Sequence, residues 1–316
     1  MEKSPPPPHS ASQMTGARAQ TPHSSLFYAA GPPVDEALPV VTVGVRFHDS
    51  SRLALLERCL CGIGAQVGVH VHVHLALQDF TPTAEQQIRR SSLAALDGSG
   101  FSLIIENVPN PDKADLRSRL LNRIVDAHYD RGQSDYLCFI DFDDMWFGHA
   151  LETLVHPLRS ANYAMSYADI HCADVYTDSG QIYLRGIKDV YQISQKTKRD
   201  LLRGNFLPLH SYMFHTGRID RSVLSYDETL ERLEDFDVLL AVAGSYPVSG
   251  LYRNRLIGLY NFYETTQGDL NSTPSVFSSL PADPALKSIW KRSNAAIIAR
   301  HAGTKWQEYF GEEWLI

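Results

Sequence analysis

Three aspartates within four positions, Asp141, Asp143 and Asp144, are the residues best suited to chemistry in this sequence. They follow directly on an apolar run, residues 136–140, that has the length of a buried strand. Clustered carboxylates beside a core are costly, because like charges repel each other and charged groups resist desolvation. A divalent cation with oxygen ligands removes this cost. A cap for a helix beginning near Gly148 explains the same acids equally well, so the surrounding elements must decide.

The three acids stand at the end of the last of four apolar, β-rich segments, residues 39–45, 67–77, 101–108 and 136–140. Segments with apolar residues at helical spacing separate these four runs. The alternation predicts an α/β fold with a mixed, mostly parallel sheet and helices on both of its faces. Ligands of such sheets bind beyond the carboxyl ends of the strands, where Arg46, Asp79 and Asp141 would meet. This placement favours a metal site over a helix cap.

The remaining segments extend this unit at both ends. Residues 1–37 are rich in Pro, Ser and Gly and predict a disordered tail. Beyond the acids, patterns predict helices near 151–158 and 228–243, a strand pair at 163–176 and 181–184, and a short strand at 257–263. Residues 283–302 predict a basic amphipathic helix within a C-terminal extension, 266–316. We expect it to pack on the core, with peripheral contact to a membrane surface as the alternative.

Composition excludes several classes of protein. The 316 residues are 44% hydrophobic and 21% charged, as in ordinary globular proteins. A net charge of −7 argues against nucleic acid as a partner. The four cysteines fit neither a disulfide framework nor CxxC zinc spacing. No apolar run is long enough for a transmembrane helix, and no signal core is present at the N-terminus. We therefore expect a cytoplasmic protein.

The order of these features resembles family 2 glycosyltransferases of the GT-A fold. The resemblance covers about residues 40–265 and rests on the first strand, Asp79, the sequence Arg-Leu-Leu-Asn-Arg at 119–123, and Asp-Phe-Asp-Asp at 141–144. A second motif, Leu-Glu-Asp-Phe-Asp at 233–237, is similar to the Glu-Asp pair that family members carry at a helix start near the acceptor. It implies a domain over 38–265, with a nucleotide-binding half at 38–144 and an acceptor half at 145–265.

The resemblance implies a metal-dependent, inverting transfer of a sugar from a nucleotide donor, expected to be a UDP-sugar, to a hydroxyl acceptor. The acceptor is a glycan, a lipid-linked intermediate or a protein. A Mn²⁺ or Mg²⁺ ion would neutralise the leaving diphosphate. Carried over by position, Asp143 would be the principal metal ligand, Asp141 would face the donor and the metal, and Asp144 would support them. Around the nucleobase the resemblance implies Asp79, Arg46 and Phe47. Arg119 or Arg117 would lie near the base or the diphosphate.

Asp235 is the expected general base, because an inverting transfer needs a carboxylate to take the proton of the attacking hydroxyl. Glu234 is the next candidate. The alternative for both is a helix start, where acids stabilise the macrodipole without any function.

The sequence departs from the family in two places. Many members supply a late histidine as a metal ligand, but residues 259–271 contain none, which leaves water, Glu264 or His210 to replace it. Val-Arg-Phe-His at 45–48 stands where the family has Pro-Thr-Tyr-Asn, so the donor stays open. Two other functions also stay open: a nucleotidyltransferase, although no glycine-rich loop follows the first strand, and a non-catalytic module that binds a glycan or a partner.

Overall fold

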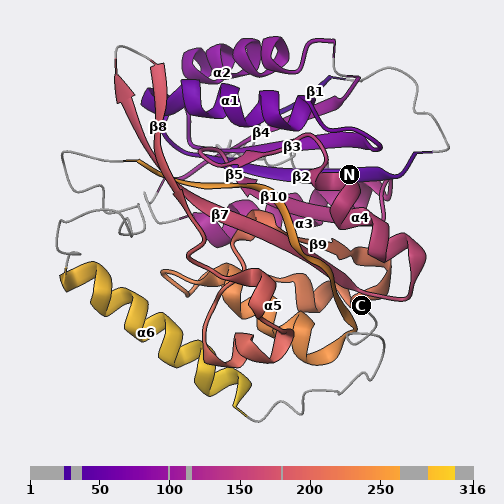
Figure 1. Cartoon of the computed structure of the whole chain (residues 1–316). Helices are drawn as coiled ribbons and strands as arrows, with labels where there is room; N and C mark the ends of the chain where they lie inside the picture. The colour runs from indigo at the N-terminus through magenta and orange to yellow at the C-terminus, as the bar shows by residue number, and fades with distance from the viewer. Residues whose placement is uncertain are drawn as a thin grey trace, which may run out of the picture.

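The computed structural model describes residues 25–29, 38–98, 100–111, 116–178, 181–263 and 284–302. Its described strands form one ten-stranded mixed sheet in the order β1-β4-β3-β2-β5-β9-β7-β10-β6, with β8 paired to β7 (Figure 1). Nearly all of the buried apolar side chains belong to one continuous core. The predicted α/β class with a mixed sheet is confirmed.

The first half of the chain forms the parallel part of the sheet. Four strands make it up: β2 (Val40–Phe47), β3 (His70–Gln78), β4 (Ser102–Val108) and β5 (Tyr136–Asp141). Strand β2 pairs in parallel with β3 on one side and β5 on the other, and β3 pairs with β4. These strands are largely buried on both faces, which explains why the sequence shows them as nearly continuous apolar runs.

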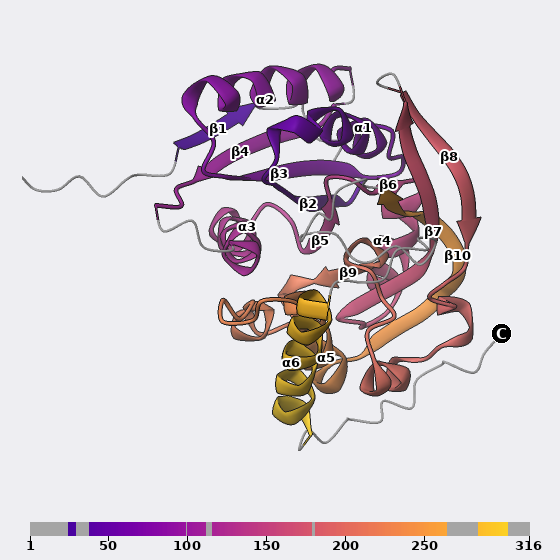
Figure 2. The same ribbon diagram turned by 90° about the vertical axis from the view of Figure 1, so that its left-hand side faces the viewer.

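Helices cover both faces of this parallel part, as predicted. Figure 2 shows α1 (Leu53–Gly64) and α2 (Pro82–Ala95) on one face and α3 (Arg117–Arg131) on the other. Helix α4 (Ala150–Ser160) packs on strands of the second half. In the described ranges, six short 3-10 helices complete the connections: η1 (Ser50–Arg52), η2 (Ile193–Gln195), η3 (Lys198–Arg203), η4 (Leu209–Ser211), η5 (Thr216–Arg218) and η6 (Arg221–Leu224).

The second half adds mixed and antiparallel strands. They are β6 (Met145–Trp146), β7 (Met165–Asp178), β8 (Gln181–Lys188), β9 (Tyr212–His215) and β10 (Val248–Tyr263). The expected hairpin is β7 with β8. Strand β10 begins at Val248, nine residues before the predicted start at 257. The sequence does not indicate this earlier part, because register shifts between Ser249 and Gly258 interrupt the alternation of side chains along the strand. Strands β6 and β9 are too short to give a sequence signal.

The prediction that all of residues 1–37 lack structure is wrong for β1 (Ser25–Ala29), which pairs antiparallel with β4. Side-chain contacts hold this strand on the sheet. The guanidinium of Arg89 lies 4.1 Å from the centroid of the Phe27 ring, and the Ser25 hydroxyl donates to Glu85 at 2.8 Å. These contacts involve α2, more than 50 residues along the chain, so a local pattern could not predict them. The rest of this N-terminal segment lies outside the described residues.

The C-terminal helix α6 (Pro284–His301) packs on α5 (Glu234–Ser245). Ile297 is fully buried in the core, and Arg300 and His301 both pair with Asp237 in the first turn of α5. The expected packing of this helix on the core is therefore confirmed. The remaining residues of the extension lie outside the described part of the chain. No helix in the described ranges has the length and apolar character needed to cross a membrane.

Candidate active site

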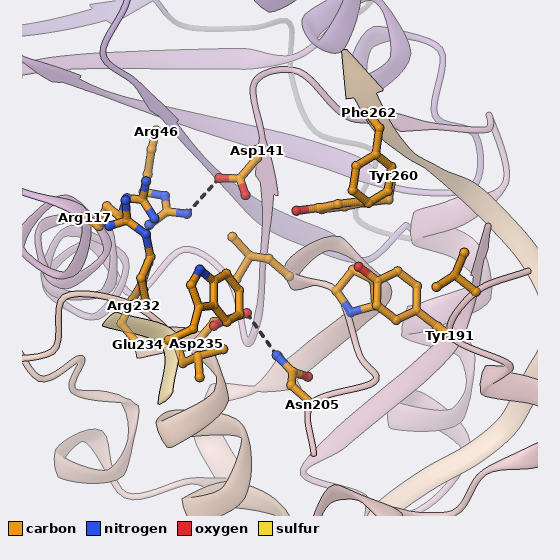
Figure 3. A pocket seen from close by; sticks show the side chains of 15 residues that line it. Arg46, Arg117, Asp141, Tyr191, Asn205, Arg232, Glu234, Asp235, Tyr260 and Phe262 are labelled. Carbon is orange, nitrogen blue, oxygen red and sulfur yellow. Dashed lines mark hydrogen bonds and ion pairs between the residues drawn. The ribbon is translucent and has the colours of Figure 1, made fainter. Parts of the chain in front are cut away.

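A cavity of about 310 Å³ opens where β2 and β5 end against the start of α5 (Figure 3). Parallel strands bring their carboxyl ends to the same edge of a sheet, and the cavity lies at that edge. Segments from both halves of the chain contribute to its walls. The lining residues are Arg46, Arg117, Asp141, Val190, Tyr191, Asn205, Pro208, Leu209, Arg232, Leu233, Glu234, Asp235, Tyr260, Phe262 and Trp290.

Arg46 joins the two halves of the cavity. Its Nη2 donates to Oδ1 of Asp141 at 2.8 Å and its Nη1 to Oε1 of Glu234 at 2.7 Å. Burial opposes the charge of Arg46, but the two carboxylates outweigh burial and raise its pKa. Burial likewise opposes the charge of Asp141, and Arg46 outweighs it and lowers the pKa of that carboxyl. Arg46 and Asp141 therefore stay ionised. The two ion pairs of Arg46 fix the ends of β2, β5 and α5 relative to one another.

Asp235 also belongs to this group, beside Glu234 at the start of α5. Burial and the neighbouring charge of Glu234 raise its pKa to about 7, although Arg46 opposes them. The Asn205 amide donates to it from Nδ2 at 3.5 Å, and the backbone N–H of Phe236 also donates to it. Leu233, with φ of 65°, turns the backbone into α5 in the left-handed region, so the two acids that follow enter the cavity from the helix start. A carboxylate with this pKa is suited to accept a proton near neutral pH.

Asp143 lies after the end of β5, outside the lining of this cavity. Its Oδ2 accepts from Nη2 of Arg52 at 2.9 Å, and the guanidinium of Arg52 lies over the rings of Phe142 and Tyr263 at 4.9 and 5.3 Å. Burial, followed by the charge of Asp141, raises the pKa of Asp143, and Arg52 opposes this. The side chain of Asp143 is 24% exposed, so it is partly open to a ligand.

Asp144 points into the protein. The residue is 1% exposed, its Oδ1 accepts the backbone N–H of Asn261 at 2.8 Å, and its Oδ2 lies 3.2 Å from Nδ1 of His210. Burial and the charge of Asp143 raise its pKa well above the usual range. Asp144 thus connects β10 to the turn after β5, and neither of its oxygens reaches the cavity.

No protein family model matches the chain, and no curated protein matches it by sequence. Solved structures do match. The structure of S. aureus TarS 1–349, a glycosyltransferase, aligns with a TM-score of 0.51 at 12% identity over 71% of this chain. The same TarS fragment in complex with UDP-GlcNAc aligns with a TM-score of 0.54 at 12% identity, covering 86% of this chain and 68% of that one.

This chain has a glycosyltransferase fold. At 12% identity the likeness concerns the fold alone, and the chain spans 60% of the length of the first TarS structure. The fold implied by the resemblance of the sequence is thereby confirmed.

Within this glycosyltransferase fold, Phe47 does not offer a surface to a nucleobase. It is fully buried, stacks on Phe80 with ring centroids 5.5 Å apart, and meets Phe142 edge-on at 5.0 Å. The expectation that Phe47 lines a pocket is wrong, because two aromatic side chains from neighbouring loops cover it. It instead packs in the core directly after Arg46.

Asp79 and Arg119 also lie outside the cavity lining. Asp79 is exposed after β3 in the left-handed region, with φ of 54°. Arg119, on the exposed side of α3, donates from Nε to Oε2 of Glu228 at 3.1 Å. Arg117, two positions earlier on the same helix, is the arginine that lines the cavity. The sequence places both arginines on this helix, but only the packing of α3 decides which of them faces inward.

Of the two side chains expected to replace the missing histidine, the structure describes His210. His210 is fully buried and stacks on Tyr260 with ring centroids 5.9 Å apart. Burial lowers its pKa to about 4, although Asp141 opposes this, so the ring is neutral at physiological pH. Glu264 lies outside the described residues. His210 therefore supports Asp144 and the cavity wall and does not reach the surface near Asp143.

The sequence did not predict several of the residues that line the cavity. Tyr191 follows β8, Tyr260 lies on β10 with its ring edge toward Tyr191, and Trp290 comes from α6. Arg232 stands two positions before the Glu-Asp pair, and that proximity is the one signal that could have drawn attention to it. The aromatic residues come from segments whose pairing only the folded chain reveals.

The residues after β5 fit a divalent cation held by one or two protein carboxylates. Asp143 offers a partly exposed carboxylate, and Asp141 precedes it by two positions. Within the described ranges, the acids of 141–144 do not bring three ligand atoms within 4.8 Å of one another. Mg²⁺ and Mn²⁺ need only one or two carboxylates where substrate phosphates complete the coordination, so this donor set is sufficient for them and too sparse for a closed structural site.

Proposed function

We propose that this protein transfers a sugar from a nucleotide-sugar donor to a hydroxyl acceptor with inversion at the anomeric carbon. The observation that carries the proposal is Asp235, a cavity carboxylate whose pKa of about 7 suits a general base. The glycosyltransferase fold supports it, as does the complex of the similar TarS structure with UDP-GlcNAc. A UDP-sugar is the donor we expect.

In the proposed step, the acceptor oxygen attacks the anomeric carbon while the carboxylate of Asp235 takes the hydroxyl proton. The bond from that carbon to the diphosphate breaks, and the nucleoside diphosphate leaves with the electron pair. Glu234 and Asp141 hold Arg46 beside the reacting groups, at 2.7 and 2.8 Å. Tyr191, Tyr260 and Trp290 offer ring faces and edges to sugar rings and exclude water from one side.

Asp143, together with Asp141, would hold Mn²⁺ or Mg²⁺. When bound, the cation neutralises negative charge on the leaving diphosphate. Asp144 is assigned a positioning role in this scheme, because its two oxygens face Asn261 and His210. Arg52 would exchange its contact with Asp143 for the incoming phosphates, which an arginine binds equally well.

The test measures donor hydrolysis and thermal shift across a panel of nucleotide sugars, with and without Mn²⁺. We expect one nucleoside diphosphate to stabilise the protein in a metal-dependent way. Asp235→Asn should keep that stabilisation and lower turnover by about 10²- to 10⁴-fold, the range for loss of a general base. Asp143→Asn should abolish the metal-dependent part of donor binding.

Three outcomes would contradict the proposal. Loss of donor binding in Asp235→Asn would remove its assignment as base. Release of pyrophosphate with formation of a nucleotidyl product would identify a nucleotidyltransferase. Absence of a thermal shift with every donor would favour a module that binds a glycan or a partner without catalysis.

A further inference from the structure

Asp169, His171 and Asp189 form a second group of metal-ligating side chains, apart from the acids that follow β5. Each offers one ligand atom, and these atoms all lie within 4.8 Å of one another. In the described part of the chain, no other three side chains of His, Cys, Asp or Glu meet this criterion. None of the three lines the cavity, but Val190 and Tyr191, which follow Asp189, do.

The strand pairing brings the three residues together. Asp169 and His171 are two positions apart on β7, so their side chains leave the strand on the same face. Strand β8 runs antiparallel to β7 and ends with Lys188 opposite Cys172, so the next residue, Asp189, lies beside His171. Nε2 of His171 is 3.2 Å from Oδ2 of Asp169.

Asp189 is held in place by a backbone contact of its own. Its Oδ1 accepts the N–H of Gln192 at 2.7 Å, and Gln192 adopts φ of 51° in the left-handed region. A conformation that costs energy for a side chain other than glycine persists only where its surroundings enforce it. The turn after β8 therefore presents the Asp189 carboxylate in a fixed orientation.

An unsatisfied oxygen of Asp169 is a second, independent observation that favours a bound ligand. The residue is 5% exposed, and its Oδ1 is buried without any hydrogen-bond partner. A buried acceptor left unsatisfied costs about 1–3 kcal/mol, and more when it is charged. Two acids and an unsatisfied oxygen at one point favour a cation between them.

The contact with His171 does not satisfy the unpaired oxygen of Asp169. Nε2 of His171 lies 3.2 Å from Oδ2 of Asp169, the other oxygen of that carboxyl group. Oδ1 therefore stays without a partner. A cation lying among all three side chains contacts each of them and removes both the repulsion and the unsatisfied acceptor.

We propose that Asp169, His171 and Asp189 bind a Zn²⁺ ion, with water in the remaining position. One imidazole nitrogen and two carboxylate oxygens are within the ligand range of zinc, whereas Mg²⁺ and Ca²⁺ favour oxygen alone. The ion connects β7 to the residues after β8. Because Val190 and Tyr191 come next and line the cavity, zinc binding also orders one wall of the site.

The test uses tag-free, full-length protein that has been treated with a chelator and dialysed. Titration with Zn²⁺ alone against a chromophoric zinc chelator should give one tight site per chain. His171→Ala and Asp189→Asn should each weaken that site by about tenfold or more, since loss of even a supporting group has such an effect on metal sites. His156→Ala, which changes an exposed histidine, is the matched control and should bind zinc as the unaltered protein does.

Co²⁺ provides a readout that needs no variant, because visible absorption reports a nitrogen ligand and a low coordination number. Asp143→Asn should keep this spectrum while losing metal-dependent donor binding, so failure of the zinc site and failure of the proposed transferase are distinguishable. The proposal is overturned if the treated protein binds no stoichiometric Zn²⁺. It is also overturned if His171→Ala and Asp189→Asn fold and bind zinc unchanged.

Discussion

At the scale of single residues, the three acids in the first turn of α5 have separate roles. Glu234 contacts Arg46, Asp235 faces the cavity, and Asp237 contacts Arg300 and His301 of α6. Sequence alone describes all three as acids at a helix start, where the macrodipole stabilises negative charge. Their neighbours decide which of them faces the cavity and which forms ion pairs with other elements.

The pH dependence of activity follows from Asp235. The base accepts a proton only when it is ionised, and burial with the Glu234 charge raises its pKa to about 7. We therefore expect kcat/KM for donor turnover to fall about tenfold per pH unit below about 7 and to level off above it. A pH–rate profile at saturating metal measures this.

Glu234→Gln should move the midpoint of that profile to lower pH, because the like charge beside Asp235 is removed and Arg46 remains. Glu231→Gln is the matched control, since Glu231 is exposed and pairs with Arg292 at the surface. It should leave the midpoint unchanged. A midpoint that stays near 7 in Glu234→Gln would show that another group titrates.

At the scale of elements, α6 is attached to the domain by contacts of unequal value. Asp237, 9% exposed at its side chain, accepts from both Arg300 and His301. Arg292 and Glu231 form an ion pair whose side chains are 60% and 58% exposed. Water screens the second pair, so its contribution to stability is small.

Asp237→Ala should therefore lower the free energy of unfolding by about 1–3 kcal/mol, as for loss of hydrogen bonds to a charged, buried group. Arg292→Ala should change it by less than about 0.5 kcal/mol. Urea denaturation measures both, and fluorescence of Trp290 reports whether α6 separates first. Equal effects of the two substitutions would contradict this account of how α6 is attached.

Strand β2, at the centre of the parallel strands, approaches its neighbours closely at Gly44. A Cβ atom there would lie 2.6 Å from Cδ1 of Phe139 and 2.8 Å from Cγ2 of Ile124, and both side chains are fully buried. Gly44→Ala should destabilise the protein by about 1–3 kcal/mol through overpacking. Gly186→Ala on β8 has no atom within 4 Å of the new Cβ and should change stability by less than about 0.5 kcal/mol. Thermal denaturation of the two variants compares them.

At the scale of the whole molecule, the first half could be predicted because parallel strands buried on both faces are apolar runs in the sequence. The second half could not be predicted to the same extent. Strand β10 is interrupted by register shifts, and β6 and β9 depend on partners at least 45 residues away. Four of the predicted site residues meet in the cavity, because strand ends and a helix start converge there: Arg46, Asp141, Glu234 and Asp235.

The other site residues could not be inferred from local sequence. Asn205 and Tyr191 come from irregular segments, and their approach to the cavity depends on the fold of the second half. For Phe47 the sequence suggested contact with a ligand, because the residue ends a strand at the ligand-binding edge. In the folded chain Phe80 and Phe142 cover its ring. Such burial depends on residues far away in the sequence, so local sequence does not predict it.

Strand β1 has a practical consequence for anyone who shortens this protein. It occupies the outer side of β4, which without it would present a row of unpaired N–H and C=O groups at the margin of the sheet. Exposed margins of this kind recruit strands from other molecules and lead to aggregation. The Pro-rich composition of the N-terminal segment suggests a shortened protein that begins at residue 38. We expect such a protein to keep the cavity intact but to be less soluble.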